Sequence, residues 1–178
     1  MRKIIAVCGS DASDPDLSEF ALKVAEKVGY FIAERGGVLV CGGGGGVMEA
    51  ACRGVKKAGG LSIGVLPEKK DYANSFLDVA LTTYLGRARN YIIVRSSDVV
   101  IGIAGRWGTL NEVSLSLNVG KPTIIVKGTG GWSDILSSNS LQDFLRSFPT
   151  RPFIADSAKQ AVDIAFKVIE QKEQQWRK

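Results

Sequence analysis

Residues 37–50 read GVLVCGGGGGVMEA, an apolar run of strand type followed by a glycine turn and the start of a helix. Consecutive glycines lack Cβ atoms, so the backbone can adopt positive φ and its N–H groups can approach an anion closely. The unpaired N–H groups and the dipole at the N-terminus of the following helix also favour negative charge. The residues expected to help bind a phosphorylated ligand here are Gly43, Gly44, Gly45, Gly46 and Met48.

The glycine run does not by itself identify a nucleotide. No Lys-Ser/Thr pair follows it, so it is not a Walker P-loop. A GxGxxG match is trivial in a run of five glycines. A tight turn between a strand and a helix, without any ligand, is the alternative interpretation.

Short apolar runs alternate along the chain with amphipathic segments of helix length. This alternation is typical of βαβ units, in which helices cover both faces of a parallel sheet. We expect an α/β fold, a single doubly wound Rossmann-like domain over residues 1–178 with a mostly parallel sheet flanked by helices. Strands are expected over residues 4–8, 38–41, 61–66, 99–103 and 123–126, with a short extended piece at 149–152. Helices are expected over residues 17–33, 47–57, 87–96 and 157–171, with one more beginning near residue 108, and residues 67–85 read as an irregular loop.

The bulk composition is that of an ordinary globular protein, with 178 residues, 45% of them hydrophobic and 23% charged. No apolar run approaches the roughly 20 residues that span a bilayer, so a membrane partner is not expected. The chain also enters its first strand too early for a signal peptide. These features predict a cytoplasmic protein.

The chain contains no histidine and only three cysteines. The missing histidine excludes Ser-His and Cys-His catalysis and removes the commonest general base near neutral pH. Cys8, Cys41 and Cys52 form no zinc pattern, so no metal site is expected, and they read as small core residues. Any chemistry must therefore use carboxylates, Arg, Lys, Tyr or a bound cofactor.

The net charge of +5 suits an anionic ligand. The basic residues are dispersed over many segments, and no basic stripe is interleaved with aromatic residues. A nucleic acid partner is therefore not expected.

Residues 105–112 read GRWGTLNE and form a second strand-to-helix turn. Ligands of a doubly wound sheet lie outside the carboxyl ends of its strands, so both glycine-containing turns can face one ligand. The alternative is that Thr109 and Glu112 merely form a capping box at the helix start. The candidate binding residues in this turn are Gly105, Arg106, Gly108 and Thr109.

Residues 86–113 resemble the core of the LOG family, long labelled lysine decarboxylase-like. Members of that family carry an Arg-Lys pair, a strand ending in Pro-Gly-Gly, and a Gly-Thr pair closely followed by Glu. The first glycine turn with Met48 is likewise similar to a glycine and Leu-Met element of the family. The positions that match the three motifs are Arg89 and Asn90, then Ala104, Gly105 and Arg106, then Gly108, Thr109 and Glu112.

The departures from the LOG pattern resemble one branch of the superfamily. Residues 47–50, the pair at 89–90 and the strand end at 64–67 are more similar to molybdenum cofactor carrier proteins and to relatives called DprA/Smf-related. For LOG enzymes the resemblance implies hydrolysis of the N-glycosidic bond of nucleoside 5'-monophosphates. For the carrier proteins it implies binding without turnover.

Under the enzyme interpretation, the resemblance implies that Arg89 and Glu112 are the catalytic residues. The Glu112 carboxylate would face the ribose and stabilise positive charge in an oxocarbenium-like state. Arg89 would hold the substrate or that carboxylate, since its planar guanidinium engages phosphate or carboxylate bidentately. Asn90 in place of Lys removes a charge, and Arg106 in place of Gly either adds a phosphate contact or fills space that the substrate needs.

The favoured function is a binding or carrier protein for a small phosphorylated molecule, either an AMP-like nucleotide or the molybdenum cofactor, with no cofactor required. A phosphoribohydrolase acting on nucleoside 5'-monophosphates is the second hypothesis. A DNA-processing accessory protein is the third, ranked last because the basic residues are dispersed. The resemblance also implies a homodimer or a higher homo-oligomer.

Overall fold

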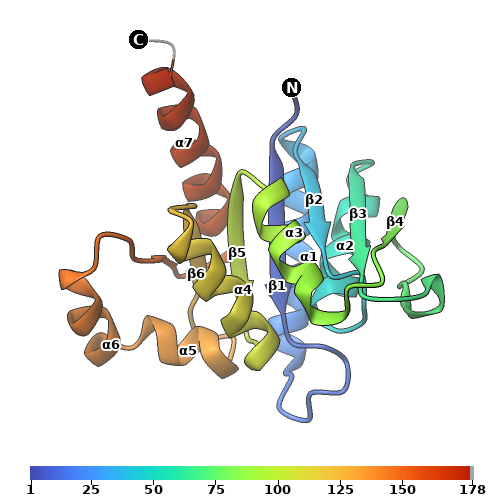
Figure 1. Cartoon of the computed structure of the whole chain (residues 1–178), viewed down its shortest axis with the longest axis horizontal. Helices are drawn as coiled ribbons and strands as arrows, with labels where there is room; N and C mark the ends of the chain where they lie inside the picture. Colours follow the sequence, from blue (N-terminus) through green and yellow to red (C-terminus); the bar gives the residue numbers. More distant parts are fainter. Residues whose placement is uncertain (177–178) are drawn as a thin grey trace.

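A parallel sheet forms the centre of the protein in a computed structural model that describes residues 1–176 (Figure 1). In this part of the chain the sheet has seven strands in the order β4-β3-β2-β1-β5-β6-β7, and every neighbouring pair is parallel. The predicted α/β, doubly wound fold is therefore confirmed. The strands are β1 (Ile4–Gly9), β2 (Val38–Cys41), β3 (Leu61–Leu66), β4 (Val79–Thr82), β5 (Val99–Ile103), β6 (Thr123–Val126) and β7 (Phe153–Ala155).

Helices cover both faces of the sheet because successive strand residues point to opposite sides. Ile5 and Val7 of β1 belong to the core beneath α1 (Glu19–Glu34), α2 (Val47–Lys57) and α7 (Ala158–Trp176). Ala6 and Cys8 belong to the core beneath α3 (Arg89–Ser96), α4 (Trp107–Asn118) and α5 (Gly131–Ser137). In Figure 1, α3 and α4 lie in front of the sheet and α1 and α2 lie behind it. The short α6 (Asn139–Phe144) follows α5.

Two glycines allow α1 and α2 to approach each other at backbone distance. A Cβ on Gly29 would collide with the carbonyl oxygen of Ala51, and a Cβ on Gly54 would collide with the carbonyl oxygen of Glu26. A glycine inside a helix costs about 1 kcal/mol relative to alanine, so the close packing has to offset that cost. The contact holds α2 firmly against α1 directly after the glycine run.

The order of the strands creates a switch point between β1 and β5. The chain builds β1 to β4 outward to one edge of the sheet, crosses back to β5 beside β1, and continues to β7 at the other edge. The loops after β1 and β5 therefore lead to helices on opposite faces and leave a crevice between them. The carboxyl ends of these two central strands position the candidate site.

Most of the predicted elements are confirmed. The five predicted strands appear as β1, β2, β3, β5 and β6, and β1 runs one residue further, to Gly9. Helix α2 has its predicted bounds, and α1 begins at Glu19 behind Ser18, whose hydroxyl accepts a hydrogen bond from the Ala21 N–H at 3.1 Å. Cys8, Cys41 and Cys52 are buried, as expected for core residues.

Three predictions are corrected. The stretch read as an irregular loop contains β4, a strand whose apolar Val79 and Leu81 side chains are exposed at the sheet edge. Because the apolar residues of this four-residue strand face solvent and not the core, their pattern does not predict a strand. Asp78, directly before β4, anchors it to β3 by accepting hydrogen bonds from the Ser62 N–H at 2.8 Å and from the Ser62 hydroxyl at 2.9 Å. Helices α5 and α6 were not expected, and the last extended piece lies at β7, just beyond residues 149–152.

In the part of the chain that the structure describes, no helix combines the length and apolar character needed to cross a lipid bilayer.

Candidate functional site

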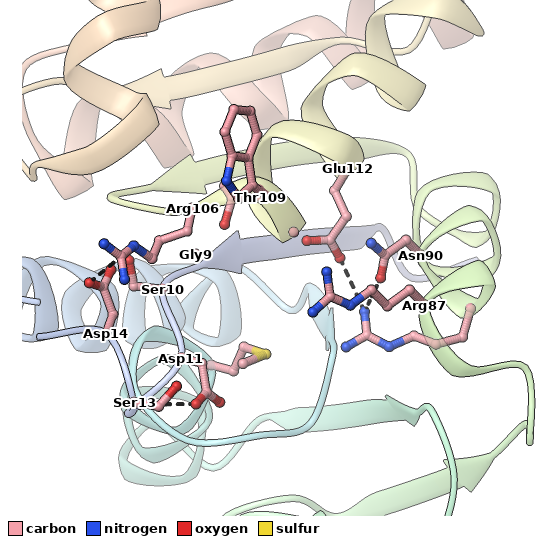
Figure 2. A pocket seen from close by; sticks show the side chains of 14 residues that line it. Gly9, Ser10, Asp11, Ser13, Asp14, Arg87, Asn90, Arg106, Thr109 and Glu112 are labelled. Atoms are coloured by element: carbon pink, nitrogen blue, oxygen red, sulfur yellow. Dashed lines mark hydrogen bonds and ion pairs between the residues drawn. The ribbon is translucent and has the colours of Figure 1, made fainter.

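A cavity of about 390 Å³ opens at the carboxyl edge of the sheet, at the switch point between β1 and β5 (Figure 2). Small-molecule sites commonly enclose about 300–1,000 Å³, so the cavity has the size for a small ligand. In Figure 2, Asp14 and Arg106 lie at one end of the cavity, and Asn90 and Glu112 lie at the other. The lining residues are Gly9, Ser10, Asp11, Ser13, Asp14, Met48, Arg87, Arg89, Asn90, Arg106, Trp107, Gly108, Thr109 and Glu112.

Ser10 ties together three of the segments that form the cavity. Its hydroxyl accepts a hydrogen bond from the Gly105 N–H at 2.8 Å, which joins the loops after β1 and β5. Its carbonyl oxygen accepts another from the Val47 N–H at 2.9 Å, which joins the β1 loop to the start of α2. The cavity is therefore framed by mutually bonded loops.

Glu112 places a buried carboxyl group in the cavity wall. It lies on α4 with only 9% of its side chain exposed, and its Oε1 is 3.5 Å from an Arg89 terminal nitrogen. Burial raises the pKa of Glu112 from 4.5 to about 7, and the Arg89 charge opposes that rise. A carboxyl group with this pKa can donate or accept a proton near neutral pH.

Arg89, the first residue of α3, is the cation beside this carboxyl group. One terminal nitrogen donates to the Asn90 side-chain oxygen, and Asn90 in turn donates to the Asn111 side-chain oxygen at 2.9 Å. A Cβ on Gly42 would collide with the other terminal nitrogen. Among residues 1–176, the buried Arg89 Nε has no hydrogen-bond partner. Asn90, where the LOG family carries Lys, is thus a buried residue that orients Arg89.

Arg106 extends from the start of α4 toward the loop after β1. Its Nε lies 3.5 Å from Asp14 Oδ1, and a terminal nitrogen lies 3.5 Å from Asp16 Oδ2. The pKa of Asp14 is lowered, first by a hydrogen bond from the Ser10 hydroxyl and then by the Asp16 N–H and the Arg106 charge. Asp14, whose side chain is 6% exposed, is therefore an ionised carboxylate that Arg106 screens at one end of the cavity.

Helix α4 presents its N-terminus to the cavity through Gly108 and Thr109. The N–H groups of its first turn have no acceptor within the helix. Among the residues that the structure describes, the side chain of the N-cap residue, Arg106, makes no capping hydrogen bond to them. Thr109 is the third helical residue, so the alternative interpretation of a Thr109–Glu112 capping box is wrong. The helix begins at Trp107, one residue before the predicted start.

The strand end before α4 also differs from the LOG motif in backbone conformation. Ala104, at the position of the family's Pro, has a φ of 51°. Proline holds φ near −65°, so this loop follows a path that a proline here could not follow.

The glycine run after β2 contacts the cavity only through its neighbour Met48. The Asn74 amide donates to the carbonyl oxygens of Gly43 at 3.1 Å and Gly44 at 3.0 Å. A Cβ on Gly46 would lie 2.5 Å from the Ser10 carbonyl oxygen, so the run packs under the loop after β1. Gly43, Gly44, Gly45 and Gly46 do not line this cavity, and neither does Gly105, whose N–H donates to the Ser10 hydroxyl. A ligand contact for these five glycines stays a prediction.

The structure brings the remaining predicted residues together in one cavity: Met48, Arg89, Asn90, Arg106, Gly108, Thr109 and Glu112. Sequence reasoning missed the loop after β1, which contributes Ser10 and Asp14, and it also missed Arg87 as a cavity residue. The loop carried a usable signal, because Gly9, Ser10 and Asp11 follow the first strand at the same sheet edge as the two glycine turns.

The fold and the site together define a Rossmann-like α/β protein with an arginine-lined cavity at the switch point of its sheet. The profile of the SLOG cluster4 family matches residues 2–161, and the chain belongs to this family. The resemblance to the LOG-like superfamily is thereby confirmed.

Two solved structures and one curated protein show the relatives of this chain. The molybdenum cofactor binding protein from the phototrophic bacterium Rippkaea orientalis superposes with a TM-score of 0.81 at 38% identity, covering 95% of this chain and 98% of that one. The molybdenum cofactor carrier protein of Chlamydomonas reinhardtii superposes with a TM-score of 0.78 at 31% identity, covering 96% and 99%. The cytokinin riboside 5'-monophosphate phosphoribohydrolase of Mycobacterium tuberculosis is 30% identical over 165 residues, covering 85% of this chain and 88% of that protein.

Proposed function

We propose that this protein binds a small phosphorylated molecule, a nucleotide or the molybdenum cofactor, in the cavity between β1 and β5 and carries it without turnover. The observation that carries the proposal is a cavity at the switch point of the sheet whose lining combines three arginines with a helix N-terminus. Arg87, Arg89 and Arg106 all line this cavity, and the N-terminus of a twelve-residue helix faces it. Arginine and helix N-termini are the groups that recur in phosphate recognition.

The three arginines have different parts in the proposed complex. Arg87 is exposed and forms no ion pair with any described residue, so it is free to meet a phosphate oxygen. Arg89 is mostly buried beside Glu112 but lines the cavity, so its guanidinium can add a charged hydrogen bond to the same phosphate. Arg106 remains ion-paired with Asp14 and Asp16, and its charge offsets theirs at the end of the cavity formed by the loop after β1.

The residues of the cavity suit a phosphorylated pterin as cargo. Arg87, Arg89 and the first turn of α4 would hold the phosphate. Trp107 is 70% exposed at the cavity mouth and offers an aromatic face on which a flat pterin or purine ring can stack. The sequence identity of 38% and 31% to two molybdenum cofactor proteins supports this class of cargo.

A phosphoribohydrolase is the second candidate, and Glu112 is the observation that favours it. Water would add to the anomeric carbon of a nucleoside 5'-monophosphate as the bond to the base breaks, releasing the base and ribose 5-phosphate. A carboxyl group with a pKa of about 7 can deliver or accept the proton of that exchange at neutral pH. The relative named as such an enzyme supports this candidate at the level of the superfamily.

One experiment tests both candidates. The purified protein is titrated by calorimetry with AMP, GMP and inorganic phosphate, and each mixture is then assayed for free base. In parallel, the protein is isolated from cells that make the molybdenum cofactor, and the extracted ligand is oxidised and read by pterin fluorescence.

The expected result is saturable binding of a nucleotide or a co-isolated pterin without base release, weakened by Arg89→Ala and unchanged by Arg146→Ala. Arg146 is a suitable control because it pairs with Asp143 and does not line the cavity. Base release that disappears in Glu112→Gln would establish the enzyme instead. A folded protein that binds none of these ligands would contradict both candidates.

A further inference from the structure

A second cavity, of about 670 Å³, lies at the amino ends of the strands, whereas the first cavity lies at their carboxyl ends. It is formed where β6 and β7 begin, between the end of α4 and the C-terminal half of α7. It shares no lining residue with the cavity at the carboxyl edge. Its lining residues are Leu117, Gly120, Lys121, Pro122, Gln142, Pro149, Thr150, Arg151, Pro152, Phe153, Ile154, Val168, Gln171 and Lys172.

The charge of this second cavity is entirely positive. Lys121, Arg151 and Lys172 line it, and none of its lining residues is acidic. Within residues 1–176, none of the three forms an ion pair, although Lys127 and Lys159 each pair with an aspartate elsewhere. The three cations therefore line the cavity without a carboxylate among the other lining residues.

The contacts that these cations do make orient them without compensating their charge. The Lys121 ammonium donates to the carbonyl oxygens of Arg95 at 3.2 Å and of Ser97, and the Lys172 ammonium donates to the Gly120 carbonyl oxygen at 3.2 Å. A carbonyl oxygen is a neutral acceptor and leaves the positive charge of its donor in place.

Mutual repulsion within the cluster is visible in Lys121. Burial lowers the pKa of this lysine, and the charges of Arg95 and Lys172 lower it further, whereas Asp98 opposes the shift. Asp98 is also engaged at the start of β1, where it accepts a hydrogen bond from the Ile4 N–H at 2.7 Å. An anion in the cavity would relieve this repulsion, because each cation would gain an opposite charge.

Much of the remaining wall is apolar, beside the polar side chains of Gln142, Thr150 and Gln171. Leu117, Ile154 and Val168 are partly exposed there, and 45% of Phe153 is exposed. Apolar area removed from water stabilises a complex by roughly 25 cal/mol per Å² before the costs of association. The wall therefore favours a ligand that has an apolar body as well as a negative charge.

We propose that this second cavity binds a small amphipathic anion, in which a carboxylate, phosphate or sulfonate group meets Lys121, Arg151 and Lys172 and an apolar body lies against Phe153 and its neighbours. The site is independent of the cargo proposed for the first cavity. Its volume lies within the range of about 300–1,000 Å³ common to small-molecule sites.

The test uses 8-anilinonaphthalene-1-sulfonate, a fluorescent probe with one sulfonate and an apolar body. The full-length protein is titrated with the probe, and the dissociation constant is compared with that of the Arg151→Gln/Lys172→Gln variant. Both side chains are exposed, so the variant should fold, and circular dichroism checks that it does. Losing two partly screened charge contacts predicts about tenfold weaker binding.

The matched control is Lys127→Gln/Lys159→Gln, which removes the same charge from lysines that line neither cavity. It should bind the probe as the wild type does, and uncharged N-phenyl-1-naphthylamine should bind at least about tenfold more weakly than the sulfonate. Competition by octanoate and by octyl phosphate then distinguishes a carboxylate ligand from a phosphate ligand. Equal probe affinity in the wild type and the Arg151/Lys172 variant would overturn the proposal.

Discussion

The buried carboxyl group of Glu112 should make the stability of this protein fall as the pH rises toward neutrality. In the unfolded chain its pKa is the ordinary 4.5, and in the folded protein burial raises that pKa to about 7. Between these two values the folded state holds a proton that the unfolded state has released. The free energy of unfolding therefore decreases as the pH rises through this window and levels off above it.

The size of the effect follows from the two pKa values. A difference from 4.5 to about 7 corresponds to about 3 kcal/mol, since one pKa unit is about 1.4 kcal/mol. Most of this loss, about 2–3 kcal/mol, falls between pH 5 and pH 8. Glu112→Gln places a neutral amide of similar shape in the same site, so the variant should lack this dependence on pH.

The assay is urea unfolding, followed by tryptophan fluorescence and circular dichroism, for the wild type and Glu112→Gln at pH 5 and pH 8. The stability of the variant relative to the wild type should increase by about 2–3 kcal/mol between the two pH values. Glu34→Gln, which changes an exposed carboxylate, should follow the wild type at both. If the difference between Glu112→Gln and the wild type is the same at pH 5 and pH 8, the reasoning from burial is refuted.

Two further predictions concern the glycine run after β2 and the ion pairs of Arg106. Gly46 and Gly59 have φ of 68° and 66°, but a Cβ on Gly46 would lie 2.5 Å from the Ser10 carbonyl oxygen and one on Gly59 would meet nothing within 4 Å. Urea unfolding should therefore show a loss of about 1 kcal/mol for Gly59→Ala and at least about 3 kcal/mol for Gly46→Ala, and equal losses would contradict the steric argument. Arg106→Ala should weaken AMP binding about tenfold in calorimetry, because Asp14 stays ionised through its Ser10 hydrogen bond, and adding Asp14→Asn should restore most of the affinity. An undiminished loss in the double variant would mean that Arg106 contacts the ligand directly.

The parallel sheet was predictable because its central strands are buried on both faces. Residues 38–41 and 124–126 are continuous apolar runs, and every one of these residues is buried. Strand β4 gives no such signal, since it lies at the edge and turns Val79 and Leu81 outward. Its pairing depends on a long-range contact between Asp78 and Ser62, which local patterning does not contain.

The candidate site was predictable in part for a similar reason. The turn that contains Gly108 and Thr109 must lie at the carboxyl edge once β5 is known to be a parallel strand, so its place in the cavity followed from the sequence. The position of Arg106 did not follow, because its partners Asp14 and Asp16 come from a loop about ninety residues away along the chain.

The sequence by itself determined the fold class, the edge of the sheet at which the two glycine-containing turns lie, and the choice of Arg89 and Glu112 as candidate residues. These properties depend on hydrophobic periodicity and on short motifs, which are local. Only the tertiary structure decided that the glycine run packs under the loop after β1, that Glu112 is buried deeply enough to raise its pKa to about 7, and that a second, cationic cavity lies at the opposite edge. Burial and charge compensation arise from contacts between distant segments, and those contacts exist only once the strands have assembled in their final order.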